Sequence, residues 1–295
     1  MAASPTVHVP VLANEVIEWL DPQPGKIIVD GTLGGGGHSR LLAERLAGQG
    51  QIIGIDRDPK AVARTAKVLD GLPVRCVHGS YADLPEILNE LGIDQVDGVL
   101  LDLGLSSDQL ADQERGFSFT VDGPLDLRFD PTQGEPAWRF LERLSAEQLA
   151  NIIFEYGEER HSRRIAKAVV ETRRAAPIRT AAELADLVRR CVPRSRTTKL
   201  DPATRTFQAL RIAVNDELKI LDRALTTLPE CVRPGGRIAV ISFHSLEDRR
   251  VKVAFRQDQR YVILTKKPIR PNESEMQRNP RSRSAKLRVA ARAPR

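Results

Sequence analysis

The sequence predicts an α/β fold, in which a largely parallel sheet is interrupted by an all-helical insertion. Two patterns carry this prediction. Over the first hundred residues, short apolar runs alternate with segments whose apolar residues recur at helical spacing, as in strands joined by crossover helices. From about residue 138 to residue 192 the spacing is helical throughout. A chain of 295 residues has room for one large domain that carries such an insertion.

Strands and helices are expected to alternate in the first part of the chain. The apolar runs predict four strands, at residues 26–30, 51–56, 74–78 and 96–103. The segments between them predict three helices, at residues 39–46, 59–69 and 84–91. The second of these helices has a clear start, because Asp58 can cap it and Pro59 fits its first turn. The crossovers of such a sheet are right-handed.

The pattern changes after the fourth strand. Residues 104–134 are rich in Gly, Asp, Ser and Pro and are expected to form a loop before the helical segment. The remaining elements are expected to be a helix at 207–228, a turn at 232–236, a fifth strand at 237–243 and an antiparallel pair of edge strands at 261–265 and 286–290. The domains predicted in this way are a sheet domain, 1–106 with 207–295, and an insertion, 107–206.

The composition is that of a soluble enzyme and excludes several classes of protein. Hydrophobic residues make up 41% of the chain and charged residues 28%. No run of about 18 apolar residues could span a membrane, and the first residues lack the pattern of a secretory signal. The three cysteines (Cys76, Cys191 and Cys231) lie far apart, which argues against a disulfide framework or a zinc site. We therefore expect a cytoplasmic protein without a bound metal.

The charge distribution favours a polyanionic partner. The net charge is +6, and Lys and Arg outnumber Asp and Glu by thirteen to four between residues 160 and 205. From residue 277 to the end there are seven basic residues and no acidic one. Such stretches attract nucleic acid, although solvated helix faces followed by an unstructured tail would give the same counts.

The most informative stretch is VDGTLGGGGH at residues 29–38, where Asp30 ends the first strand and a glycine-rich turn opens a helix. Such a turn lets a ligand approach the backbone closely. A nicotinamide dinucleotide would need G-x-G-x-x-G, and the glycine spacing here departs from it. Asp30 suits the ammonium group of an amino-acid ligand and would repel a pyrophosphate. The turn therefore favours S-adenosylmethionine over a dinucleotide.

Two further residues are expected to extend this cofactor site. Asp56 ends the second strand, where a carboxylate can accept hydrogen bonds from both hydroxyls of a ribose. Asp58 can cap the following helix, so Asp56 is not needed for that purpose. Tyr81 follows the third strand and could stack on adenine, although a lone tyrosine at a strand end more often serves only in packing. Together with the glycine-rich turn, these residues occur in the right order on successive strands.

Longer motifs give the chain a family resemblance. They are HVPVL at 8–12, DGTLGGGGHS at 30–39, DRDP at 56–59, LDLGLSS at 101–107, RGFSF at 115–119, DGPLD at 122–126, YGEER at 156–160, ATRTFQ at 203–208, SFHSLEDR at 242–249 and NPRSRS at 279–284. In these motifs, and over nearly its whole length, the chain resembles the bacterial small-subunit (16S) rRNA cytosine-N4 methyltransferases, the RsmH or MraW family.

The resemblance implies a Rossmann-like class I methyltransferase sheet with S-adenosylmethionine as cofactor. It also implies that the chain methylates N4 of a specific cytidine in the decoding region of 16S rRNA, either in free rRNA or in the assembled small subunit. Carried over by position, the family's cofactor contacts fall on Gly36, Gly37, His38, Asp56, Tyr81, Asp102 and Gln109. Asp30 and Gly34 join this set from the residue pattern alone.

The catalytic candidates follow the fourth strand. Related amino-methyltransferases bind the acceptor at this position, which here holds Asp102, Ser106 and Ser107. Hydrogen-bond acceptors there could hold the two hydrogens of N4 and free its lone pair, which is otherwise delocalised into the ring. Alternatively, Asp102 only holds the cofactor and the serines only cap a helix. No general base is required, so His38 and His244 are interpreted as binding residues.

The enzyme must bind the RNA backbone while the target base is unstacked from its neighbouring bases. The expected clamps are the Arg-rich tail and seven basic residues of the insertion: Arg160, Arg163, Arg164, Lys167, Arg173, Arg174 and Arg179. Phe117 and Phe119 could stack on the target base or simply pack. The alternative functions are a nicotinamide-dependent oxidoreductase, which the glycine spacing and Asp30 disfavour, and a non-enzymatic ribosome-assembly factor, which the intact Asp30 and Asp56 disfavour. A methyltransferase that acts on DNA or protein is excluded only by the resemblance.

Overall fold

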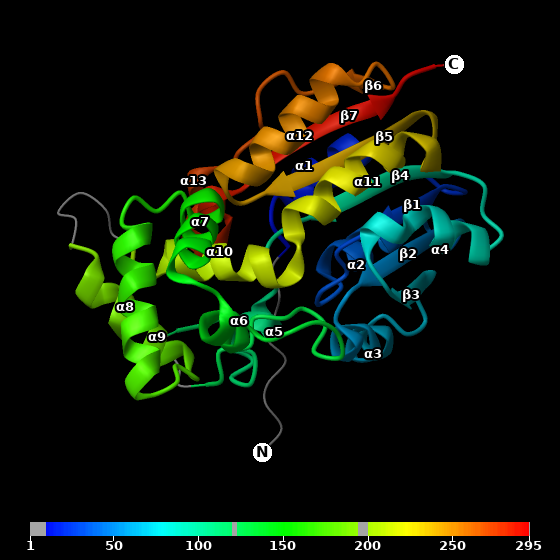
Figure 1. Cartoon of the computed structure of the whole chain (residues 1–295). Helices are drawn as coiled ribbons and strands as arrows, with labels where there is room; N and C mark the ends of the chain where they lie inside the picture. Colours follow the sequence, from blue (N-terminus) through cyan, green and yellow to red (C-terminus); the bar gives the residue numbers. More distant parts are fainter. Residues whose placement is uncertain (1–9, 120–122, 194–199, 295) are drawn as a thin grey trace. The chain divides into compact units, whose positions relative to one another are not determined.

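The computed structural model describes residues 10–119, 123–193 and 200–294, and these residues form two compact units (Figure 1). The first unit runs to Ser106 and resumes at Leu218, and the second is Ser107–Glu217. The expected insertion ended at residue 206, whereas the second unit continues through the next helix. His8, Val9 and Asp122 of the sequence motifs lie outside the described ranges, as do Arg194, Arg196 and Lys199 of the basic stretch.

The first unit is built on a mixed sheet whose seven strands have the order β3-β2-β1-β4-β5-β7-β6 among the described residues. The strands are β1 (Ile27–Asp30), β2 (Gln51–Asp56), β3 (Val74–His78), β4 (Val96–Asp102), β5 (Val232–Ser242), β6 (Tyr261–Ile263) and β7 (Lys286–Arg292). The first five pair in parallel, whereas β7 is antiparallel to both β5 and β6. The prediction of an α/β sheet with an antiparallel edge is thereby confirmed.

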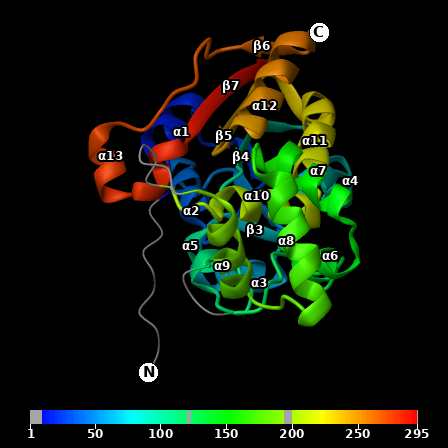
Figure 2. The same ribbon diagram turned by 60° about the vertical axis from the view of Figure 1, so that its left-hand side comes forward.

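Helices cover both faces of this sheet (Figures 1 and 2). On one face, α1 (Ala13–Leu20) and α2 (Gly37–Arg45) pack on strand residues such as Ile28 and Ile52. On the other face, α4 (Leu84–Glu90), α11 (Glu217–Cys231) and α12 (Ser245–Gln257) pack on their neighbours Val29 and Ile53. Successive strand residues point to opposite faces, so a sheet covered on both sides needs the continuous apolar runs that the sequence shows.

Two expected elements differ from the structure. The single helix expected at 207–228 is two helices, α10 (Thr204–Asn215) and α11, because Asp216 between them has a left-handed backbone with φ 50°. The turn expected at 232–236 lies within β5, where pairing with β4 skips from Val232 to Arg237. The chain therefore bulges out of the sheet at this point and then re-enters it.

The second unit is helical, as the periodicity predicts. Its helices are α5 (Ser107–Ala111), α6 (Ala137–Arg143), α7 (Ala146–Gly157), α8 (Ser162–Ala175), α9 (Ala181–Cys191) and α10. Helix α5 lies inside the stretch that was expected to be loop. Capping boxes begin α7 at Ser145 and α9 at Thr180, which satisfies backbone N–H groups that a helix start leaves open.

Hydrogen bonds from within the unit hold the described residues between α5 and α6. Arg115 is only 3% exposed and donates to the carbonyl oxygens of Arg128 at 2.8 Å and Phe129 at 3.0 Å. The amide of Asn215 donates to the carbonyl of Leu127 at 2.7 Å and accepts from the N–H of Phe129 at 2.7 Å. The RGFSF motif therefore contributes a buried arginine that holds the loop backbone.

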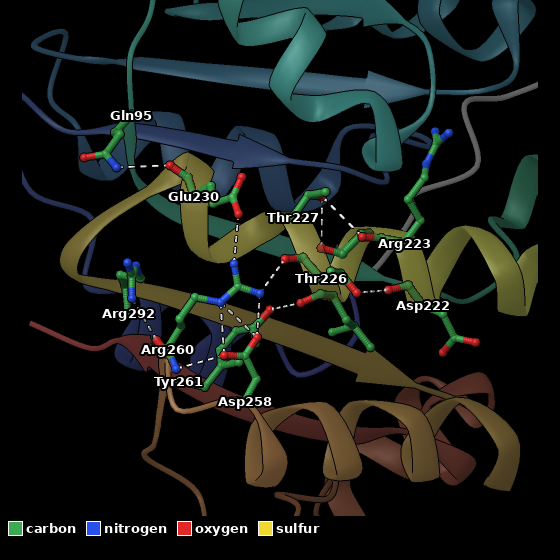
Figure 3. A network of polar contacts seen from close by, with 12 residues as sticks. Gln95, Asp222, Arg223, Thr226, Thr227, Glu230, Asp258, Arg260, Tyr261 and Arg292 are labelled. Atoms are coloured by element: carbon green, nitrogen blue, oxygen red, sulfur yellow. Dashed lines mark hydrogen bonds and ion pairs between the residues drawn. The ribbon is translucent and has the colours of Figure 1, made fainter. Parts of the chain in front are cut away.

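An arginine network ties the edge strand β6 to helix α11 (Figure 3). Arg260, just before β6, donates to both carboxylate oxygens of Asp258, to Glu230 at 2.9 Å and to the carbonyl of Thr226 at 2.8 Å. Tyr261 packs its ring on Phe255 with centroids 4.9 Å apart. The short edge strand is thus anchored by side chains as well as by its pairing with β7.

No helix among the described residues is long and apolar enough to cross a membrane.

Candidate active site

The predicted site residues of the first unit gather at the carboxyl edge of the parallel strands. β1 pairs in register with β2 and β4, so Asp30 lies beside Gly54 and Leu100. Asp56 and Asp102 end the two neighbouring strands two residues further on. Ligands of open α/β sheets bind at this edge, where the strand order reverses. The order here reverses at β1 and β4, between which the glycine-rich turn begins.

The glycine-rich turn is held in place from both sides. The N–H of Gly34 donates to Oδ2 of Asp56 at 2.8 Å, and its carbonyl accepts from the hydroxyl of Thr65 at 2.6 Å. Gly36 has φ 77°, and a Cβ at this position would lie 2.7 Å from the Thr65 methyl group. Only glycine therefore lets the turn approach helix α3 (Pro59–Val68) this closely. Gly37 begins α2 directly afterwards.

Asp56 uses its carboxylate to order the backbone around it. Its two oxygens accept from the N–H groups of Gly34 at 2.8 Å and Asp58 at 2.9 Å. Burial raises the pKa of the Asp56 carboxyl above its usual range, against the lowering effect of these two hydrogen bonds. Asp58 caps α3 by accepting from the N–H of Lys60, as the sequence predicts. Asp56 is thus fixed at the strand end with one N–H on each oxygen.

Asp30 is the most buried acid of the site, with 1% of its surface exposed. One oxygen accepts from the hydroxyl of Ser39 at 2.7 Å and the other from the N–H of Thr32 at 3.2 Å. Its carboxylate therefore links the end of β1 to the first turn of α2. The sequence did not single out Thr32 or Ser39, although both lie inside the motif at 30–39.

Asp102 ends β4 and lies against His38. Its backbone N–H donates to the hydroxyl of Thr32 at 2.7 Å, and its Oδ2 lies 3.7 Å from Nδ1 of His38. Burial raises the pKa of Asp102 to about 6, with His38 acting in the opposite direction. The ring of His38 is 6% exposed, and its Nε2 lies 2.9 Å from the carbonyl oxygen of Val11.

The remaining predicted residues divide between the two units. Tyr81 starts a short 3₁₀ turn after β3, and its Cβ lies 2.8 Å from where a Cβ on Gly31 would be. Ser106 is 8% exposed, and its Cβ lies 3.4 Å from where a Cβ on Gly34 would be. Both residues thus adjoin the glycine-rich turn. Ser107 and Gln109 lie in α5, which belongs to the second unit.

Comparison with known proteins decides the family. The model of the MraW methylase family matches residues 5–293. The chain belongs to the MraW methylase family. It is 54% identical over 302 residues to the ribosomal RNA small subunit methyltransferase H of Rhodopirellula baltica, covering 99% of this chain and 93% of that one. The protein of the same name from Deinococcus radiodurans is 51% identical, covering 99% and 92%.

As a member of this family the chain is an S-adenosylmethionine-dependent methyltransferase, which confirms the sequence interpretation and excludes the oxidoreductase alternative. The residues at the sheet edge fit this cofactor. A methionine end and a ribose require hydrogen-bond acceptors and a backbone that can be approached closely. Asp56 and Asp102 supply carboxylates, and the turn at Gly34 and Gly36 offers backbone without side chains. The described residues contain no cluster of three His, Cys, Asp or Glu side chains suited to a metal.

Two further polar side chains follow the end of β5. His244 caps α12, and the buried carboxylate of Glu247 accepts from the N–H groups of Phe243 at 2.8 Å and His244 at 3.3 Å. Nε2 of His244 lies 2.9 Å from Glu247, although its N–H is not directed at the carboxylate. Glu247 also raises the pKa of Asp102. The sequence singled out His244 and missed Glu247, whose role follows from its place three residues into the helix.

The structure gives several residues of the insertion structural contacts. Phe117 is 6% exposed and stacks on Phe129, and Phe119 packs on Phe207 with ring centroids 4.9 Å apart. Arg173 donates to the carbonyl oxygens of Leu141 and Leu144 at the end of α6. For Phe117 and Phe119 the packing alternative accounts for these contacts. Arg173 is held in the same way inside the unit.

Proposed function

We propose that this methyltransferase transfers the methyl group of S-adenosylmethionine to N4 of a cytidine in the decoding region of small-subunit (16S) rRNA. The observation that carries the proposal is the position of Asp102, which ends β4 and donates its N–H to Thr32 at the start of the glycine-rich turn, while Asp56 accepts from Gly34 in the same turn. The relatives of this chain that are named ribosomal RNA small subunit methyltransferase H support the same substrate. Ribosomal RNA also agrees with the net charge of +6.

Residues at the sheet edge would hold the cofactor, which supplies a methyl group on a sulfonium when bound. The turn from Gly34 to Gly37 would lie against its amino-acid end, with Asp30 ordering that turn through Ser39. Asp56 would accept from the ribose hydroxyls, since each of its oxygens has a free lone pair beyond the N–H that it already accepts. Tyr81 would lie along the adenine.

Asp102 and Ser106 would receive the acceptor base. The lone pair of N4 is delocalised into the cytosine ring, so this amine is a poor nucleophile. A carboxylate that accepts a hydrogen bond from N4 becomes a better partner as the nitrogen gains positive charge. The carboxylate of Asp102, whose side chain is 14% exposed, suits this role, and Ser106 adjoins the same turn. Ser107 and Gln109, which belong to α5 of the second unit, remain sequence predictions for the base and the cofactor respectively.

Exposed basic residues on both units would hold the RNA backbone. In the second unit these are Arg160, Arg163, Arg164, Lys167 and Arg174. In the first unit, Arg278, Arg281 and Arg283 are exposed around α13 (Glu273–Arg278) and the short turn after it. Guanidinium groups recognise phosphates through paired hydrogen bonds, so such residues fix the position of the RNA without reading its sequence.

Purified protein, methyl-labelled cofactor and small-subunit rRNA test the proposal. We expect label in N4-methylcytidine after digestion to nucleosides, at one cytidine of the decoding region. Free rRNA and reconstituted small subunits are to be compared as substrates, with large-subunit rRNA as the control. Label in another nucleoside, or equal labelling of large-subunit rRNA, would contradict the proposal.

A further inference from the structure

His38 connects two hydrogen-bond acceptors that lie far apart in the sequence. Its Nε2 lies 2.9 Å from the carbonyl oxygen of Val11, and its Nδ1 lies 3.7 Å from Oδ2 of Asp102. The ring is almost fully buried, with 6% of its surface exposed. Because it comes from the first turn of α2, it reaches across from the glycine-rich turn to the end of β4.

The Val11 side of this bridge is rigidly held. The next residue, Leu12, is fully buried and has a left-handed backbone with φ 53°. Its N–H donates to Oε1 of Glu275 at 2.8 Å, which ties this segment to α13. The Val11 carbonyl is therefore a fixed acceptor that can only receive a hydrogen bond. It holds Nε2 of His38 as a donor and thereby aims Nδ1 at Asp102.

An acceptor thus lies near each nitrogen of the ring. A neutral imidazole has one N–H, so with Nε2 donating to Val11 its Nδ1 would present a lone pair to an ionised carboxylate. A ring with a proton on each nitrogen donates in both directions. The 3.7 Å between Nδ1 and Oδ2 lies within the range of an ion pair. His38 lowers the pKa of Asp102 and so favours the ionised carboxylate.

The other charged groups around Asp102 act against its ionisation. Burial is the largest cause of its raised pKa, and the carboxylates of Asp30 on β1 and Glu247 on α12 add to it. His38 has the largest lowering effect, and the N–H of Gly104, 3.4 Å from Oδ1, lowers the pKa less. Without His38, one buried carboxyl would face two others with little compensation.

We propose that His38 is a positioning residue for methyl transfer, which orients the Asp102 carboxylate and keeps it ionised so that it can accept a hydrogen bond from the amine of the target base. The proposal rests on the proposed function for its last step only. It assigns the ring of His38 to Asp102 and Val11, whereas the family resemblance counts this residue among the cofactor contacts.

Titration of the Asp102 carboxyl tests the electrostatic part without RNA. Aspartate labelled with ¹³C at the carboxyl carbon gives a signal for Asp102, assigned with Asp102→Asn. In the parent we expect its midpoint near pH 6. In His38→Gln, whose amide can still reach Val11 but carries no charge, the midpoint should rise by about one pH unit or more. His38→Asn keeps an N–H near the position of Nδ1 and should show a smaller rise.

The pH dependence of methylation tests the functional part. Ionised Asp102 is the active form, so the rate at saturating cofactor should be full above its pKa and fall as the pH drops through about 6. In His38→Gln this fall should move to higher pH with the carboxyl midpoint, so that the rate recovers toward the parent value at alkaline pH. Thermal midpoints of both variants verify that the fold is retained.

Two results would overturn the role of His38. One is an Asp102 midpoint that stays unchanged in His38→Gln. The other is a rate that falls by the same factor at every pH, or a loss that added cofactor fully restores, because a cofactor contact or a purely structural role would give these. A parent enzyme that methylates no RNA would instead contradict the proposed function, and the carboxyl titration would still decide whether His38 holds Asp102 in its ionised form.

Discussion

At the scale of single residues, each acid of the site has a backbone or side-chain partner that could not be read from spacing. Asp56 was expected at the strand end to bind the ribose. In the structure its carboxylate also accepts a hydrogen bond from the N–H of Gly34. Asp30 was expected to meet the ammonium group of the cofactor, and its oxygens are directed at Ser39 and Thr32. These partners depend on how the turn closes on β1, which periodicity does not reveal.

Asp56→Ala should weaken binding of S-adenosylmethionine by about tenfold to a hundredfold. The change removes the acceptor for two ribose hydroxyls, worth about 1.5 to 3 kcal/mol, and releases the Gly34 N–H that shapes the turn. Calorimetry measures the affinity directly. Asp58→Ala is the matched control, because it removes the cap of α3 at a cost of about 1 kcal/mol in stability and should leave cofactor affinity nearly unchanged. If Asp56→Ala binds S-adenosylmethionine as tightly as the parent, Asp56 does not contact the cofactor and only orders the turn.

Asp102→Asn separates binding from turnover. The amide keeps the shape of the side chain and removes its charge. If Asp102 only holds the cofactor, added S-adenosylmethionine should restore the rate. If it also accepts from N4, turnover at saturating cofactor should fall, because that hydrogen bond strengthens in the transition state. We expect the loss at saturation to be the larger effect, measured by single-turnover methylation of a reconstituted subunit. A parent-like rate would remove Asp102 from the catalytic residues.

At the scale of elements, the helix boundary that the sequence did not predict falls at a residue with a left-handed backbone. The break between α10 and α11 falls at Asp216, a non-glycine residue with φ 50°, in a stretch whose apolar spacing continues across it. The sequence also could not show which basic residues of the insertion have structural contacts. Arg173 donates to the end of α6, and Arg179 lies over the ring of Trp138 at 3.8 Å from its centroid, so neither is simply a solvated cation.

Replacing Arg163, Arg164 and Arg174 with Ala should weaken RNA binding and leave cofactor affinity unchanged. All three are exposed on α8, so their loss removes phosphate contacts without disturbing the α6 contacts of Arg173. Fewer counterions would be released, so the salt dependence of RNA binding should become shallower. A control that replaces the exposed Arg45, Lys252 and Arg256 of the first unit loses the same three charges. Equal losses in both variants would show that α8 has no special role.

Arg260→Ala should lower the free energy of unfolding by about 1 to 2 kcal/mol, because it breaks a network that spans Asp258, Glu230 and the Thr226 carbonyl. The network anchors β6 to α11 (Figure 3). Arg233→Ala is the control, since this exposed side chain makes a single contact with Asp97 at 3.1 Å and should cost less than about 0.5 kcal/mol. Chemical denaturation measures both. A cost for Arg260→Ala no greater than the control would mean that strand pairing alone holds the edge.

At the scale of the whole molecule, the sheet and its helical insertion follow from periodicity, because each strand buried on both faces must be apolar throughout and each helix must repeat at its own spacing. The strand-end acids could be placed for the same reason, since parallel strands bring their carboxyl ends to one edge. The contacts of His38 with Val11 and Asp102 could not be predicted from the sequence. They join three segments that come together only when α1 and α2 pack on the sheet.

Mapping the methylated nucleotides of small-subunit rRNA by mass spectrometry tests the central claim most directly. rRNA is to be compared from cells with the gene, without it, and without it but supplied with the parent or the Asp102→Asn gene. We predict that one cytidine of the decoding region loses its N4-methyl group when the gene is absent, regains it with the parent gene and regains little of it with Asp102→Asn. An unchanged methylation pattern in cells that lack the gene would contradict the account.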